Sequence, residues 1–210
     1  MNPEKIPAKI LRTALVTLIS LYLVIIAGSV VRATGSGMGC PDWPKCFGQY
    51  IPPTDISQLP ADYKERFKVE GKTIADFTVA HTWTEYVNRL LGALSGLVML
   101  WLTVLSFFVW KKDRRILLLL LFGLVLLGFV GWMGKVVVDS NLKPLMITVH
   151  MSSALAIVAV TLFVYFRTRN LFGFGKQQLI PAGTGALLIG AFLFTLIQVV
   201  FGTHGLQLHA

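Results

Sequence analysis

The chain has 210 residues, of which 55% are hydrophobic and only 14% charged, whereas about a quarter of a soluble domain is charged. This composition excludes an ordinary soluble globular protein. The formal net charge of +9 would suit a nucleic-acid-binding protein, but the distribution of the charges along the chain argues against that class.

Five long apolar runs dominate the sequence. They lie at about 12–31, 90–110, 116–134, 146–166 and 179–201. A membrane-spanning helix needs roughly 20 mostly apolar residues, so the runs predict an all-α, polytopic transmembrane helical bundle. No small-x-small cleavage site follows the first run, which we therefore interpret as a helix and not as a cleaved signal peptide.

Basic residues gather in three segments: before the first run, between the second and third runs, and between the fourth and fifth. These segments hold ten cations and two acids, whereas the rest of the chain holds nine cations and eight acids. Such asymmetry is typical of the positive-inside rule. It predicts a cytoplasmic N-terminus and places the long loop at 33–88 on the outer side.

The first half of that loop contains both cysteines, Cys40 and Cys46, in the sequence CPDWPKC. A cysteine pair on the oxidising side tends to form a disulfide. A redox-active pair is one alternative, although redox dithiols usually have a two-residue spacing. Metal binding is another, although zinc sites usually need four ligands. The second half of the loop is polar, and a short helix is expected around Pro60–Glu70.

Polar side chains mark the start of the second apolar helix: His81, Glu85, Asn88 and Arg89 follow one another at helical spacing. They share one face if the helix begins before His81, and polar groups entering an apolar helix tend to point into the bundle. Glu85 and Arg89 form either a structural ion pair or a proton-transfer carboxylate held near a positive group.

His150 lies near the outer end of the fourth apolar run. An imidazole among apolar residues is either an axial ligand for heme iron or a histidine that hydrogen-bonds a neighbouring helix. Arg32, at the outer end of the first run, is either an interfacial anchor or a cation that holds an acidic group such as a heme propionate. All these polar groups lie toward the outer side, which favours a single site there.

Several of these motifs resemble a known family. Residues 28–46 (GSVVRATGSGMGCPDWPKC) look like the first-helix and loop signature of heme A synthase, the CtaA family. Residues 85–89 (EYVNR) resemble its second-helix glutamate motif, and residues 135–141 and His150 match in order and spacing. The resemblance covers nearly the whole chain, and its variant motifs are similar to the form found in Bacteroidetes-type bacteria.

The resemblance implies an oxidoreductase that converts a methyl group of heme O to the formyl group of heme A by successive hydroxylations, with water as the oxygen source. It implies that Glu85 is the essential carboxylate and that His150 is the iron ligand of the substrate heme. Cys40 and Cys46 match a cysteine pair linked to activity. Arg32 and Arg89 match propionate or structural partners.

Two departures from the family pattern affect the expected heme sites. Asn88 stands where many members have a histidine, and His81 lies two turns earlier, roughly 10 Å along a helix, so it cannot simply replace that ligand. The family fold has two four-helix repeats, and the second binds heme b through two histidines. We expect the first repeat at 1–170 and only the first helix of an incomplete second repeat at 171–210, without the heme b ligands.

The expected setting is the bacterial inner (plasma) membrane, with heme O, heme O synthase, the bilayer and a second copy of the chain as partners, and no nucleic acid. Two other functions stay open. A membrane b-type cytochrome that carries electrons would need His150 but neither Glu85 nor the cysteines. A thiol-disulfide membrane oxidoreductase would have reactive Cys40 and Cys46 and no heme.

Overall fold

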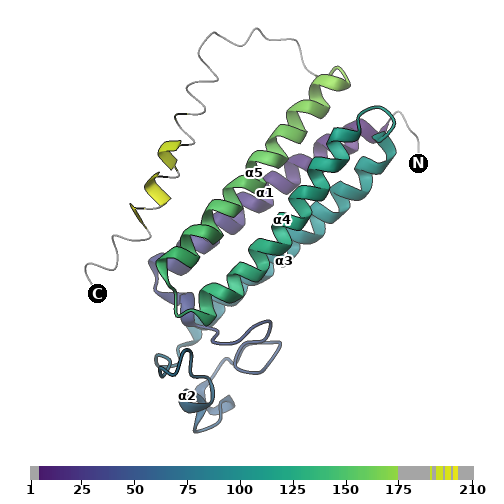
Figure 1. The fold of residues 1–210 in the computed structure, drawn as a ribbon. Helices are drawn as coiled ribbons and strands as arrows, with labels where there is room; N and C mark the ends of the chain where they lie inside the picture. The colour runs from purple at the N-terminus through teal and green to yellow at the C-terminus, as the bar shows by residue number, and fades with distance from the viewer. Residues whose placement is uncertain (1–4, 175–189, 191–192, 196, 200, 203–210) are drawn as a thin grey trace.

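The computed structural model describes residues 5–174 together with residues 190, 193–195, 197–199 and 201–202. Its long helices are α1 (Ile6–Ala33), α3 (Val79–Ser106), α4 (Arg114–Asp139) and α5 (Pro144–Leu171) (Figure 1). Each is long and apolar enough to span a membrane, which confirms the first four predicted spans and the all-α membrane fold. Most of the predicted fifth span at 179–201, and most of the segment 171–210, lies outside the described residues.

The four long helices form an antiparallel bundle in which α1 packs beside α3 and α5, and α4 packs beside α3 and α5 (Figure 1). One end of the bundle, here called the basic end, holds the start of α1, the connection at 107–113 between α3 and α4, and the end of α5. The opposite end, here called the loop end, holds the end of α1, the start of α3 and the connection at 140–143.

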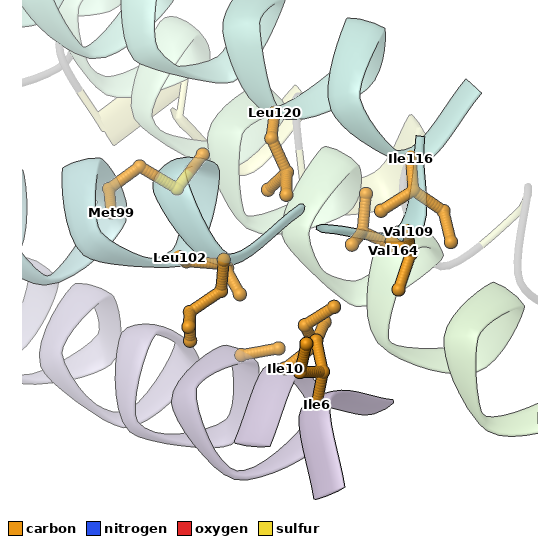
Figure 2. Close-up of a cluster of buried hydrophobic side chains, with 10 residues drawn as sticks. Ile6, Ile10, Met99, Leu102, Val109, Ile116, Leu120 and Val164 are labelled. Atoms are coloured by element: carbon orange, nitrogen blue, oxygen red, sulfur yellow. The ribbon is translucent and has the colours of Figure 1, made fainter. Parts of the chain in front are cut away.

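The basic end has a filled apolar core to which all four helices contribute (Figure 2). Its buried side chains are Ile6, Ile10, Ala14, Met99, Leu102, Leu105, Val109, Ile116, Leu120 and Val164. Met99 shows how tightly this end is packed. A Cβ atom added to Gly123 on α4 would lie 2.5 Å from the Met99 Cε atom, so the methionine fills the space that the glycine leaves.

The loop end is packed less completely. Every residue at 146–156 of α5 is half-buried, none fully buried and none fully exposed. A helix in a closed bundle normally divides its surface between a buried stripe and an outward face. The uniform half-burial therefore indicates that, among the described helices, α1 and α4 do not close over this part of α5.

Residues 34–78, here called the outer cap, fold over the loop end. They include two short 3₁₀ helices, η2 (Ser36–Met38) and η3 (Ile56–Gln58), and one short α-helix, α2 (Tyr63–Arg66). Thus the helix expected around Pro60–Glu70 is present, but it is only one turn long. The cap has its own core, in which the Phe47 ring makes edge-to-face contacts with Tyr63, Phe67 and Phe77.

Candidate functional site

A disulfide joins Cys40 to Cys46, both fully buried, and closes a small ring of residues 40–46, here called the disulfide ring. This confirms the pairing expected from the sequence; whether the bond exchanges with other thiols stays a prediction. The carboxylate of Asp42 accepts hydrogen bonds from the backbone N–H groups of Phe47 and Gly48, at 2.6 and 2.9 Å. Asp42 therefore fixes the turn by which the chain leaves the ring.

The residue before the ring, Gly39, lies directly against the backbone of α3. A Cβ atom added there would lie 2.5 Å from the carbonyl oxygen of His81 and 2.6 Å from its carbon, so only glycine fits. The Thr82 hydroxyl donates a hydrogen bond of 3.0 Å to the Gly39 carbonyl. These contacts fix the disulfide ring on the first turns of α3.

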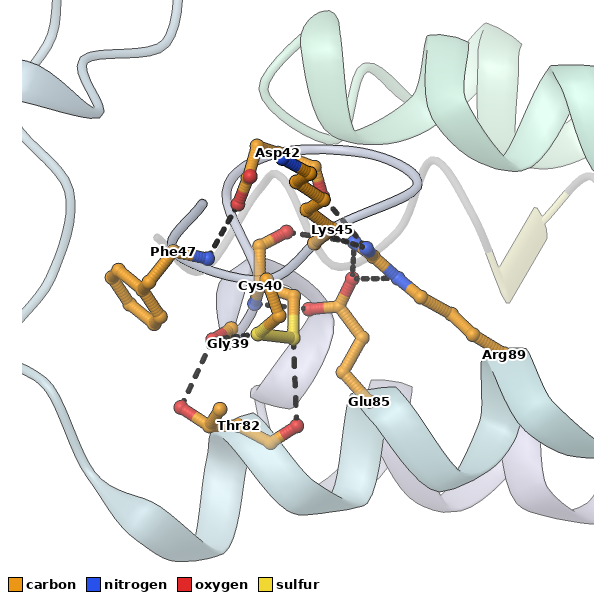
Figure 3. Close-up of polar contacts among 9 residues, drawn as sticks. Gly39, Cys40, Asp42, Lys45, Phe47, Thr82, Glu85 and Arg89 are labelled. Carbon is orange, nitrogen blue, oxygen red and sulfur yellow. Dashed lines mark hydrogen bonds and ion pairs between the residues drawn. A yellow bond between two sulfur atoms is a disulfide. The ribbon is translucent and has the colours of Figure 1, made fainter. Parts of the chain in front are cut away.

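Glu85 lies beneath the ring and is only 4% exposed. Its Oε2 atom accepts a hydrogen bond of 2.8 Å from the Cys40 N–H group (Figure 3). Its Oε1 atom is paired with the guanidinium of Arg89, one turn further along α3. The carboxylate is thus held from two sides, by a backbone amide of the cap and by a cation of its own helix.

Arg89 also binds the ring (Figure 3). Its Nη1 atom donates to the carbonyls of Asp42 and Lys45, at 2.7 and 3.1 Å, and its Nη2 atom donates to the Cys40 carbonyl at 2.7 Å. A guanidinium carries five N–H groups. Two point at Glu85 and three at ring carbonyls, so every donor is used.

The structure places the other predicted site residues apart from this group. α3 begins at Val79, before His81, as a shared face would require, but the His81 side chain is exposed whereas Glu85 is buried. Asn88 faces α1, where a Cβ atom added to Gly28 would lie 3.8 Å from its Oδ1 atom. His150 faces α4, with its Cε1 atom 3.6 Å from a Cβ atom added to Gly134.

Arg32 lies at the end of α1, and its Nη2 atom donates a hydrogen bond of 2.7 Å to the carbonyl of Gly202. Its Nη1 atom is one of several buried polar atoms at the loop end that have no hydrogen-bond partner among the described residues. The others are Trp83 Nε1, Asn88 Oδ1 and His150 Nδ1. Because buried polar groups are normally hydrogen-bonded, this part of the bundle offers donors and acceptors to a ligand.

Sequence reasoning missed three residues that build the site: Gly39, Asp42 and Thr82. Asp42 left a recognisable signal, since an aspartate next to proline in a tight loop often accepts backbone N–H bonds. The roles of Gly39 and Thr82 depend on contacts between segments more than 40 residues apart, which the sequence does not reveal.

The fold and the site define a polytopic helical membrane protein with a buried carboxylate beneath an outer disulfide. The family model of COX15-CtaA, described as cytochrome oxidase assembly protein, matches residues 12–210. The chain therefore belongs to this family.

Similar curated proteins come from several bacteria and carry the name heme A synthase. The protein of Bartonella bacilliformis is 30% identical over 205 residues, which cover 92% of this chain and 56% of the relative. That of Nitrosomonas eutropha is 34% identical over 158 residues, covering 69% and 44%. That of Shewanella oneidensis is 29% identical over 154 residues, covering 73% and 44%.

The chain spans about half the length of these relatives. No solved structure matches it. The four spans and the bacterial relatives identify the chain as a multi-pass protein of the inner (plasma) membrane.

Proposed function

We propose that this chain provides the site at which a heme A synthase oxidises a methyl group of heme O to the formyl group of heme A. The observation that carries the proposal is the buried carboxylate of Glu85, held by the Cys40 amide and by Arg89 at the loop end of a membrane bundle. Membership of the COX15-CtaA family and the name heme A synthase given to the relatives support the same reaction.

The residues of the loop end suit a heme. A heme has a flat apolar ring, an iron that imidazole binds well and two acidic propionates. The half-buried face of α5 at 146–156 suits the ring. The Nδ1 atom of His150 suits the iron and the Nη1 atom of Arg32 suits a propionate, since neither has a hydrogen-bond partner among the described residues. We assign these roles to His150 and Arg32.

Asn88 and His81 take secondary roles in this proposal. The oxygen of the Asn88 amide is buried and has no partner in the part of the chain that the structure describes, so it would contact the substrate by a hydrogen bond and not as an iron ligand. His81, exposed on the first turn of α3, would meet the substrate at its outer edge. We assign none of the described residues to heme b.

Glu85 would act as the general base or as the group that stabilises positive charge in this reaction. Each hydroxylation of the methyl group takes its oxygen from water and releases two protons and two electrons, so the reaction needs a separate electron acceptor, and the heme would supply the redox chemistry when bound. A buried carboxylate beside a cation can accept a proton from the attacking water, or stabilise positive charge that develops at the methyl carbon. Its two fixed partners would keep the carboxylate in one orientation during both tasks.

The substrate is apolar and membrane-soluble, so we propose that it arrives through the bilayer from heme O synthase. We further propose that two or more copies of the chain assemble in the membrane. Crosslinking of the detergent-solubilised chain, alone and together with heme O synthase, tests both contacts, and monomeric protein throughout would contradict them.

Glu85→Gln tests the catalytic assignment, with Glu65→Gln on the exposed surface of α2 as the matched control. The full chain is purified with a heme O supply, and the extracted hemes are separated by chromatography. We expect Glu85→Gln to bind heme O but to form at least about 100-fold less heme A, whereas Glu65→Gln behaves as the unchanged protein.

Two results would overturn the proposal. One is normal heme A formation by the Glu85→Gln variant. The other is an unchanged protein that holds only heme b and loses it in His150→Ala, because that pattern indicates an electron-carrying cytochrome.

A further inference from the structure

Arg89 connects the two halves of the site that belong to different segments of the chain. It lies on α3 one turn after Glu85, and its side chain is 16% exposed. The guanidinium spans from the Glu85 carboxylate to the carbonyls of Cys40, Asp42 and Lys45 across the disulfide ring (Figure 3).

These contacts leave Arg89 no free donor. All five of its N–H groups already point at protein oxygen atoms. A substrate carboxylate could bind there only by breaking contacts to the ring or to Glu85. Of the two roles that the sequence left open for Arg89, propionate partner and structural partner, the geometry favours the second.

The backbone of Cys40 binds both members of the Glu85–Arg89 pair. The Cys40 N–H group donates to Glu85, while the Cys40 carbonyl accepts from Arg89. A shift of the ring would therefore change both partners of the carboxylate at once. We propose that Arg89 is a positioning residue, which locks the Cys40–Cys46 ring onto Glu85 so that ring and carboxylate keep a single arrangement.

The proposal explains why an arginine occupies this position. Its planar fork of five donors reaches several acceptors in fixed directions, whereas a lysine ammonium is a compact charge with three donors. A lysine at position 89 could still pair with Glu85, but it could not also hold the carbonyls of Cys40, Asp42 and Lys45.

The experiment compares Arg89→Lys and Arg89→Gln with Arg66→Gln, a matched control at an exposed arginine of the outer cap. The full chain is purified in detergent, and dithiothreitol reduction of the Cys40–Cys46 bond is followed by thiol labelling. We expect both Arg89 variants to be reduced at least about tenfold faster, because charged hydrogen bonds that cover the ring are lost. The control should match the unchanged protein.

A second readout separates positioning from substrate binding. The proposal rests on the proposed role of Glu85, so heme O affinity and heme A formation are measured on the same samples. We expect heme A formation to fall about tenfold or more in both Arg89 variants, while the Kd for heme O stays within about twofold.

A weakened Kd for heme O together with an unchanged reduction rate would overturn the proposal, because Arg89 would then hold the substrate. If the unchanged protein binds no heme O, the proposed function fails, but the reduction rates still test whether Arg89 holds the disulfide ring.

Thr82→Val should weaken the attachment of the ring less than the Arg89 variants do, since it removes only the hydrogen bond to Gly39. It should speed reduction of the disulfide by a smaller factor. If Arg89→Lys, Arg89→Gln and Thr82→Val are all reduced no faster than the unchanged protein, the positioning role of Arg89 is also refuted.

Discussion

The two ends of the bundle are built from the same four helices but packed in opposite ways. At the basic end, Met99, Leu102 and Ile116 are fully buried among apolar neighbours. At the loop end, α5 is half-buried throughout 146–156, and the buried groups include a carboxylate and four polar side chains with an unpartnered atom in the described structure, against one, Thr168, at the basic end.

The contrast indicates that stability and chemistry are separated along the helix axis. Inside a bilayer, helices associate mainly through close packing and hydrogen bonds and not through the release of water. A filled basic end can therefore hold the bundle together, which leaves the loop end free to keep space and polar groups for a substrate. The outer cap covers that end and contributes the Cys40 amide to the site.

Gly39→Ala should have the largest effect on the site at the loop end. The new methyl group would collide with the backbone of His81, so the disulfide ring must lift from α3 and the Cys40 N–H bond to Glu85 must lengthen or break. Losing one aligned donor at a reaction centre costs about 100-fold in rate, and we expect heme A formation to fall at least that far. The melting temperature should change little, because the basic end is untouched.

Gly128→Ala is the control for this substitution. It adds the same methyl group on α4, where no described residue of another segment lies within 4 Å. Equal heme A formation by the Gly39 and Gly128 variants would show that the close contact between the disulfide ring and α3 has no part in the reaction.

Two methionines test the difference in packing directly. Met99 at the basic end is fully buried, whereas Met151 at the loop end is half-buried. Met99→Ala should cost about 2 kcal/mol of unfolding free energy, at the lower end of core truncations, and Met151→Ala less than about 1 kcal/mol. Unfolding in detergent measures both, and equal losses would mean that the two ends are packed alike.

The hydropathy of the sequence was sufficient to predict the four described spans, because the thickness of a bilayer fixes how long an apolar helix must be. Hydropathy alone marks the second span only from residue 90, whereas α3 begins at Val79. The helical spacing of His81 and Glu85 is what indicated the earlier start. Glu85 and Arg89 lower the mean hydropathy of this part of the sequence. In the structure the two side chains pair with each other, and Glu85 also accepts a hydrogen bond from the outer cap.

The composition of the site was predictable, but its assembly was not. Spacing and position indicated that Cys40 and Cys46 pair and that Glu85 points inward. Nothing in the sequence indicated that a backbone amide of the ring would meet that carboxylate, because the contact joins residues 45 positions apart. The half-burial of 146–156 could not be predicted either, because the hydropathy of an apolar helix does not depend on whether the helix faces lipid, protein or a ligand.

The smallest expected effect concerns Asp113, which caps α4 at the basic end. Its carboxylate accepts hydrogen bonds from the Arg115 N–H group at 3.0 Å and from Arg167 Nε at 2.6 Å. Desolvation by burial acts to raise the pKa of Asp113, but the bonds from Arg167 and Arg115 outweigh it and hold this pKa below its usual value of 3.8. Because the folded-state pKa is depressed, the carboxylate stabilises the fold above pH 3.8, and this stabilisation is lost as the pH falls through the lower, folded-state value.

Asp113→Asn keeps an oxygen that can cap the helix, whereas Asp113→Ala removes it. At neutral pH we expect losses of about 0.5 and about 1 kcal/mol, in that order, by unfolding in detergent. The gap between the unchanged protein and Asp113→Asn should close below pH 3.8, where protonation removes the same charge. Asp62→Asn, in the outer cap, is the control. A loss from Asp113→Asn larger than that from Met99→Ala would mean that ion pairing, and not apolar packing, holds the basic end together.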